Sequence, residues 1–122
     1  MREIKFRAWD EKNKVMINAI FVGLGKVYGM TKTFKPSKKL EDVILMQYTG
    51  LKDNKNNKEI YEGDIVKANI NNVVSIGKVV YIDDWAMFQT EFTIGNIGRY
   101  SCYEDDEVIG NIYENPELLD KD

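Results

Sequence analysis

The residues best suited to contact a charged partner are the lysines of residues 12–40. This stretch holds seven lysines without one acidic residue, and aromatic residues stand between them. Lysine neutralises phosphates and exposed aromatic rings stack on bases, so the pattern suits nucleic acid or another partner. The candidate contacts are Lys26, Tyr28, Lys32, Phe34, Lys35, Lys38 and Lys39. The alternative is a solvated loop whose aromatic side chains face the core, and lysine lacks the planar fork with which arginine reads guanine.

Two acidic clusters are the candidates for metal chemistry. Asp83 and Asp84 form the first, and residues 104–107 form the second. Paired carboxylates that bind a divalent cation can support hydrolysis of a phosphodiester. Adjacent residues of a strand point to opposite faces, however, so each cluster offers few convergent ligands. A solvated acidic turn is the simpler interpretation, and a carboxylate-metal hydrolase is therefore only the third hypothesis for function.

The sequence has no histidine and a single cysteine, Cys102. Ser-His-Asp and Cys-His arrangements are therefore excluded, and a zinc site cannot use imidazole. Cys102 lies in an expected strand, where a small apolar role is favoured over a nucleophilic one. We accordingly expect no enzymatic activity and no cofactor. A single cysteine cannot form an intrachain disulfide, and the first residues lack the apolar core of a signal peptide, so we expect a cytoplasmic protein without a membrane segment.

Short apolar segments separated by turn residues predict an all-β chain. Residues 4–8 alternate apolar and polar side chains and, with residues 15–17, predict an opening hairpin. Residues 31–39 are expected to form a loop, and residues 52–58 a turn. Further strands are expected over residues 40–48, 65–68, 77–83, 85–88, 92–94, 100–103 and 108–113.

Near the C-terminus, Asn115 is expected to cap a short helix that has Pro116 as its first residue. Glu62-Gly63-Asp64 predicts a tight reversal of the backbone, and Gly77 a bulge or a barrel corner. Glycine-punctuated strands of this kind resemble those of SH3-like barrels. The 122 residues, 43% hydrophobic and 30% charged, are typical of one soluble domain.

Charge is divided unevenly along the chain. Residues 1–67 contain 14 basic and 9 acidic residues, a net charge of +5. Residues 68–122 contain 3 basic and 11 acidic residues, a net charge of −8. Such a division indicates either charges that neutralise each other within one domain or contact between subunits. Strand edges also need covering, so we expect a homo-oligomer.

Three blocks of sequence resemble the YopX family of bacteriophage and prophage proteins. They are residues 2–10 (REIKFRAWD), residues 47–53 with 58–66 (QYTGLKD and KEIYEGDIV), and residues 108–119 (VIGNIYENPELL). The segments between them, above all residues 23–39, match the family pattern least. The resemblance implies β structure with a barrel-like core and a phage or prophage origin. It implies no activity that can be assigned to particular residues.

The sequence as a whole therefore predicts an all-β, small barrel-like domain, SH3-like or YopX-like, over residues 1–122, with a short C-terminal helix. The function expected first is a non-enzymatic binding or assembly module in the cytoplasm of a bacterial host, with an unknown protein partner. A nucleic-acid-binding accessory protein that uses residues 12–40 is the alternative.

Overall fold

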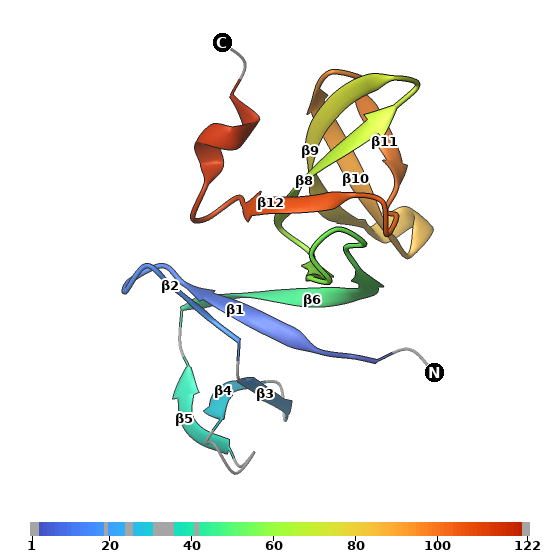
Figure 1. The fold of residues 1–122 in the computed structure, drawn as a ribbon. Helices are drawn as coiled ribbons and strands as arrows, with labels where there is room; N and C mark the ends of the chain where they lie inside the picture. Colours follow the sequence, from blue (N-terminus) through green and yellow to red (C-terminus); the bar gives the residue numbers. More distant parts are fainter. Residues whose placement is uncertain (1–2, 19, 24–25, 31–35, 41, 121–122) are drawn as a thin grey trace. The chain divides into compact units, whose positions relative to one another are not determined.

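The structure is a computed structural model and describes residues 3–18, 20–23, 26–30, 36–40 and 42–120 (Figure 1). Within these residues the chain is built of β-strands and two short 3₁₀-helices, which confirms the all-β prediction. The chain divides into two compact units, Met1–Tyr48 (unit 1) and Thr49–Asp122 (unit 2), and the division falls within strand β6. The prediction of a single domain stays a prediction.

Unit 1 contains two groups of antiparallel strands. Its strands are β1 (Phe6–Asp10), β2 (Val15–Ile17), β3 (Ile20–Gly23), β4 (Lys26–Met30), β5 (Pro36–Leu40) and the beginning of β6 (Val43–Lys52). β1 pairs with β2, as the predicted opening hairpin requires, and also with β6. β3, β4 and β5 form a separate meander. The expected loop over residues 31–39 is wrong for β5, because its backbone pairs with β4, and residues 31–35 lie outside the described residues.

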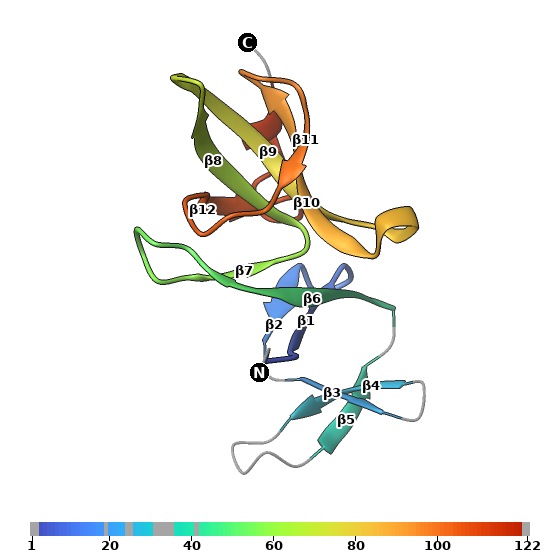
Figure 2. The same cartoon turned by 90° about the vertical axis from the view of Figure 1, so that its right-hand side faces the viewer.

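Unit 2 is dominated by one curled five-stranded sheet. Its strands are β7 (Glu59–Tyr61), β8 (Asp64–Ile70), β9 (Val73–Ile82), β10 (Met87–Ile94), β11 (Gly98–Ser101) and β12 (Glu107–Asn111), with 3₁₀-helices η1 (Asp83–Trp85) and η2 (Pro116–Leu119). The order of the sheet is β11-β10-β9-β8-β12, and β7 lies beside the end of β6. Figure 2 shows how strongly β8, β9 and β10 curve. This curled sheet is the barrel-like fold that the sequence predicts.

Local turn chemistry explains where the strands of unit 2 reverse. Asn71 and Asn72 have φ values of 52° and 67°, the left-handed conformation that asparagine tolerates in a two-residue hairpin turn. Gly63 has φ 88°, and the carboxylate of Asp64 accepts a hydrogen bond from the amide of Tyr61 at 2.8 Å. The predicted Glu62-Gly63-Asp64 reversal is thus held by a buried aspartate.

The core of unit 2 is a single cluster of side chains from several strands. Its buried members are Ile60, Val66, Val79, Phe92 and Val108, and Leu51, Ala68, Ile70 and Cys102 pack against it. The register between β9 and β10 shifts just beyond the pair formed by Gly77 and Phe92, so the irregularity expected near Gly77 lies on the facing strand, between Phe92 and Ile94. Because the cluster draws on strands far apart in sequence, it fixes the curl of the sheet.

The chain ends in the 3₁₀-helix η2, which contacts β9 and has Pro116 as its first residue. The predicted cap is wrong, because the side chain of Asn115 makes no capping hydrogen bond. Its Oδ1 atom instead accepts a hydrogen bond from the amide of Asn111 at 3.2 Å. Among the described residues, no helix is both long and apolar enough to cross a membrane.

Candidate functional site

The described part of the lysine-rich segment, residues 12–40, lies in unit 1 and includes β2 and the meander of β3, β4 and β5. Lys26 is exposed and Tyr28 is half-buried on β4, and the backbone of Tyr28 pairs with that of Lys39 on β5. Lys38 also lies on β5. The remaining predicted contacts, Lys32, Phe34 and Lys35, lie outside the described residues. The structure thus brings part of the segment together, and its role in binding stays a prediction.

The two acidic clusters lie on different turns of unit 2. Asp83 and Asp84 form the exposed helix η1, whereas residues 104–107 lead into β12. Figure 2 shows η1 on the opposite side of unit 2 from β12. In the described ranges, no three cysteine or acidic side chains are grouped so that they could hold a metal ion. The clusters therefore do not combine into a cation site there.

A hollow of about 320 Å³ lies in unit 2 between two loops. It is lined by Leu51, Asn54, Cys102, Tyr103, Glu104 and Asp105. Leu51 and Cys102 pack against the hydrophobic core, so they form an apolar floor. The ring of Tyr103, 61% exposed, and two carboxylates surround this floor. Of these residues, Cys102 and the two carboxylates were candidates for chemistry on sequence grounds, and none was expected to line a hollow.

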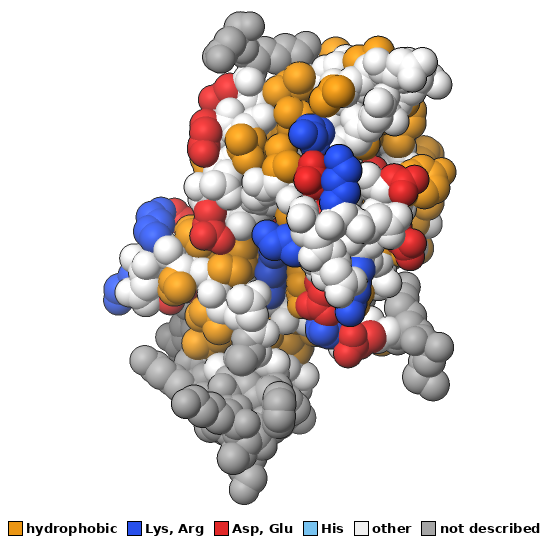
Figure 3. Space-filling view, in the orientation of Figure 1, with side chains coloured by type: hydrophobic (Ala, Val, Ile, Leu, Met, Phe, Trp, Pro, Cys, Tyr) orange, Lys and Arg blue, Asp and Glu red, His pale blue; other side chains and the backbone are white. Residues whose placement is uncertain are grey.

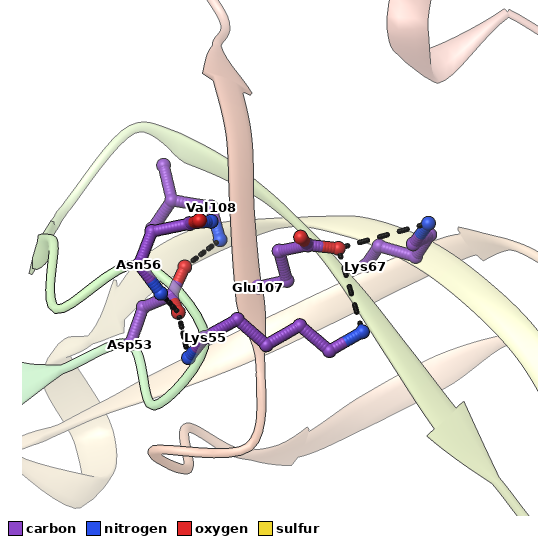
Figure 4. A network of polar contacts seen from close by, with 6 residues as sticks. All are labelled: Asp53, Lys55, Asn56, Lys67, Glu107 and Val108. Carbon is purple, nitrogen blue, oxygen red and sulfur yellow. Dashed lines mark hydrogen bonds and ion pairs between the residues drawn. The ribbon is translucent and has the colours of Figure 1, made fainter.

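The first loop, residues 52–58, is held by Asp53, whose side chain is only 1% exposed. Its Oδ1 atom accepts hydrogen bonds from the amides of Lys55 at 2.6 Å and Asn56 at 2.9 Å. Its Oδ2 atom accepts one from the amide of Val108 at 2.8 Å, on the distant strand β12 (Figure 4). Burial alone raises the pKa of Asp53, but these hydrogen bonds to the charged form outweigh it and lower the pKa below its usual value.

The second loop, residues 102–106, is held by a second buried aspartate, Asp106, which is 4% exposed. Its carboxylate accepts hydrogen bonds from the hydroxyl of Thr90 at 3.2 Å and from the amide of Tyr103 at 3.3 Å. Burial raises the pKa of Asp106, and the neighbouring Asp105 acts in the same direction. Each of the two loops beside the hollow is therefore held by hydrogen bonds to a buried carboxylate, that of Asp53 or that of Asp106.

Asn54 joins the two loops directly. Its backbone amide donates to the carbonyl oxygen of Glu104 at 2.9 Å, and its Nδ2 atom donates to Oδ1 of Asp105 at 2.9 Å. These residues are about fifty positions apart in sequence, so the hollow is a product of the tertiary fold. Two hydrogen bonds thus connect the loops on either side of the hollow.

Lys55, which follows Asn54 in the first loop, pairs with Glu107 of β12. Nζ of Lys55 lies 3.8 Å from Oε1 of Glu107, and Nζ of Lys67 lies 3.6 Å from the same oxygen (Figure 4). In the upper part of Figure 3, basic and acidic side chains lie beside each other on the face of unit 2 that is shown. Both lysines are well exposed, so these ion pairs orient side chains more than they stabilise the fold.

The family model described as YopX protein matches residues 5–120. The chain belongs to the YopX family. The chain is also similar to a solved structure, the crystal structure of protein EF1440 from Enterococcus faecalis, with 28% sequence identity and a TM-score of 0.68. The similarity covers 98% of this chain and 100% of that one. No curated protein matches the chain.

In this YopX-family chain, the blocks that carry the resemblance contain the residues that hold the turns. Asp53 and Asp64 lie in the second block, and Asn111 lies in the third. Oδ1 of Asn111 accepts hydrogen bonds from the amides of Tyr113 at 3.0 Å and Glu114 at 2.9 Å. The family pattern therefore marks the fold, whereas Tyr103, Glu104 and Asp105, at the rim of the hollow, lie outside the three blocks.

The expected homo-oligomer stays a prediction.

The thiol of Cys102 is expected to react slowly. Burial, together with the charge of Asp106, raises its pKa to about 12. At about pH 8 we therefore expect Ellman's reagent to modify the folded chain roughly 1000-fold more slowly than the unfolded chain. The measurement is the absorbance of the released thiolate in buffer and in guanidinium chloride. A folded-state rate that levels off near pH 9 would contradict the raised pKa.

Proposed function

We propose that the chain is a non-enzymatic binding or assembly module that receives a partner protein in the hollow of unit 2. The observation that carries the proposal is the construction of the hollow, with an apolar floor and two loops that are each fixed by a buried aspartate. A phage or prophage origin and a bacterial cytoplasmic setting belong to the proposal and rest on the family resemblance.

The fixed loops favour binding because they lower its entropic cost. A site whose backbone is already ordered does not lose that freedom when the partner binds. Ligand pockets commonly have volumes of roughly 300–1,000 Å³, and the hollow, at about 320 Å³, is at the lower end of this range. A hollow of this size suits one side chain of a partner protein better than a large cofactor.

The polar side chains around the hollow support binding over catalysis. Asp53 uses both carboxylate oxygens to hold backbone amides, and Asp106 holds Thr90 and the amide of Tyr103. Cys102 is protonated at neutral pH because of its raised pKa. Asp53, Asp106 and Cys102 are therefore poorly suited to act as a general base or a nucleophile.

Tyr103 provides the test of this proposal. Its ring is mostly exposed, so Tyr103→Ala removes a contact surface with little effect on stability, and exposed aromatic residues are frequent hot spots of interfaces. We expect the immobilised full chain to capture protein from a nuclease-treated lysate of a prophage-bearing bacterium. We expect Tyr103→Ala to reduce that capture about tenfold.

Trp85→Ala is the matched control, because Trp85 is equally exposed but lies on η1, away from the hollow. It should capture the same proteins as the unmodified chain. Equal capture by Tyr103→Ala would contradict the proposal. Capture that disappears on nuclease treatment would instead favour the nucleic-acid-binding alternative.

A further inference from the structure

We propose that the hollow takes an arginine side chain from an exposed segment of the partner protein. This inference rests on the proposed function and names the chemistry of the partner. The hollow combines three features that suit arginine. Its apolar floor can contact the methylenes, its exposed aromatic ring can stack on the flat guanidinium, and its two carboxylates can neutralise the positive charge.

The charge of the hollow is negative and only partly compensated. Within the described part of the chain, the carboxylate of Glu104 has no hydrogen bond or ion pair, and that of Asp105 accepts one hydrogen bond, from Asn54. Asp105 therefore keeps one carboxylate oxygen for a ligand. Two adjacent carboxylates at the rim of a hollow attract a cation and repel phosphate.

Lys55 does not compensate the charge of these carboxylates. Lys55, the lysine of the first loop closest to Asn54 in sequence, lies against Glu107, which also pairs with Lys67 (Figure 4). Unit 2 as a whole contains seven basic and fifteen acidic residues, a net charge of −8. A positively charged partner is thus favoured both locally and at long range.

The apolar part of the hollow distinguishes arginine from a small cation. Leu51 and the neutral thiol of Cys102 offer a surface on which the methylenes of a long side chain can pack. The ring of Tyr103 is exposed beside the carboxylates and can stack on a planar guanidinium. Arginine is also less strongly hydrated than lysine, so it loses less on entering a partly apolar site.

The test is a titration of the ¹⁵N-labelled full chain, followed by amide chemical shifts. The probe is the peptide acetyl-Gly-Arg-Gly-amide, and its matched control contains citrulline, which has nearly the same shape without the charge. We expect the arginine peptide to shift the amide signals of residues 51, 54 and 102–105. The shifts should saturate at roughly millimolar peptide, the affinity expected when a single side chain is bound. Citrulline should bind about tenfold more weakly.

Two double variants separate local charge from total charge. Glu104→Gln with Asp105→Asn should weaken the arginine peptide about tenfold, and Asn at 105 keeps the oxygen that accepts from Asn54. Asp83→Asn with Asp84→Asn removes the same total charge from η1 and should leave the affinity unchanged. Equal loss in both double variants would show that only the net charge matters, and the inference would be wrong.

Other outcomes also decide the question. Equal binding of the arginine and citrulline peptides, or of a Gly-Lys-Gly peptide, would overturn the assignment of arginine. If the same amides shift with protein concentration alone, a second copy of the chain occupies the hollow and the inference fails. If no arginine peptide binds while Tyr103→Ala still reduces protein capture, the inference is wrong and the proposed function stands.

Discussion

Replacing Asp53 with alanine is expected to lower the free energy of unfolding by about 3–5 kcal/mol. The substitution leaves three backbone amides without their acceptor, those of Lys55, Asn56 and Val108. The amide of Val108 lies in the core region of β12, where water cannot easily replace the carboxylate. Urea denaturation of the two chains, followed by fluorescence, measures the difference.

The effect should also depend on pH. Hydrogen bonds hold the pKa of Asp53 below its unfolded value, although burial opposes them. The stabilisation is therefore fully present above the unfolded pKa, near 3.9, and is lost as the pH falls through the lower folded value. The stability of Asp53→Ala should accordingly fall less steeply in acid than that of the unmodified chain.

Asp83→Ala is the control for the removal of one negative charge. Asp83 is exposed on η1, so we expect a change within about 0.5 kcal/mol. In Asp53→Ala, the amide shifts of Asn54 and of residues 102–105 should also move, because the first loop is released. An Asp53→Ala chain with unaltered stability and unaltered shifts would show that the carboxylate does not hold the hollow.

Gly77→Ala is expected to destabilise unit 2 by about 3 kcal/mol or more. A Cβ atom at Gly77 would lie 2.2 Å from the carbonyl oxygen of Glu91 and 2.6 Å from Cα of Phe92. Both are backbone atoms of the paired strand β10, so relief requires β9 and β10 to separate next to the bulge. Thermal unfolding followed by circular dichroism gives the loss as a lower midpoint.

Gly110→Ala is compared with Gly77→Ala because the atoms nearest its added Cβ atom belong to side chains and not to the backbone of a paired strand. A Cβ atom there would meet Oδ1 of Asn115 at 2.6 Å and Cδ1 of Leu118 at 2.9 Å, which are the ends of side chains. Side chains can turn away at moderate cost, and we expect a loss of about 1–2 kcal/mol. A larger loss in Gly110→Ala than in Gly77→Ala would contradict the assignment of the tight strand contact to β9 and β10.

Features that depend on neighbouring residues could be predicted from the sequence. Glu62-Gly63-Asp64 reverses the chain because the backbone preferences of these residues act within a few positions. Alternating apolar residues predicted the opening hairpin for the same reason. The prediction failed at β5, a polar segment whose backbone nevertheless pairs with β4. It also failed at Asn115, whose side chain accepts from the amide of Asn111 and does not cap η2.

The hollow was decided by the tertiary structure alone. In the sequence Asp53 is an ordinary turn residue, yet one of its hydrogen bonds comes from the amide of Val108, fifty-five positions away. Asp106 belongs to an acidic cluster that was expected to be solvated, yet it is buried. Burial and long-range hydrogen bonds depend on which strands pack together, and no local pattern reports them. The sequence by itself determined strands, turns and family, since these follow from short-range preference and from recurring blocks. Only the fold determined that Leu51, Asn54 and Tyr103 line one surface, because β6 and the loop between β11 and β12 belong to different sheets and are far apart in sequence.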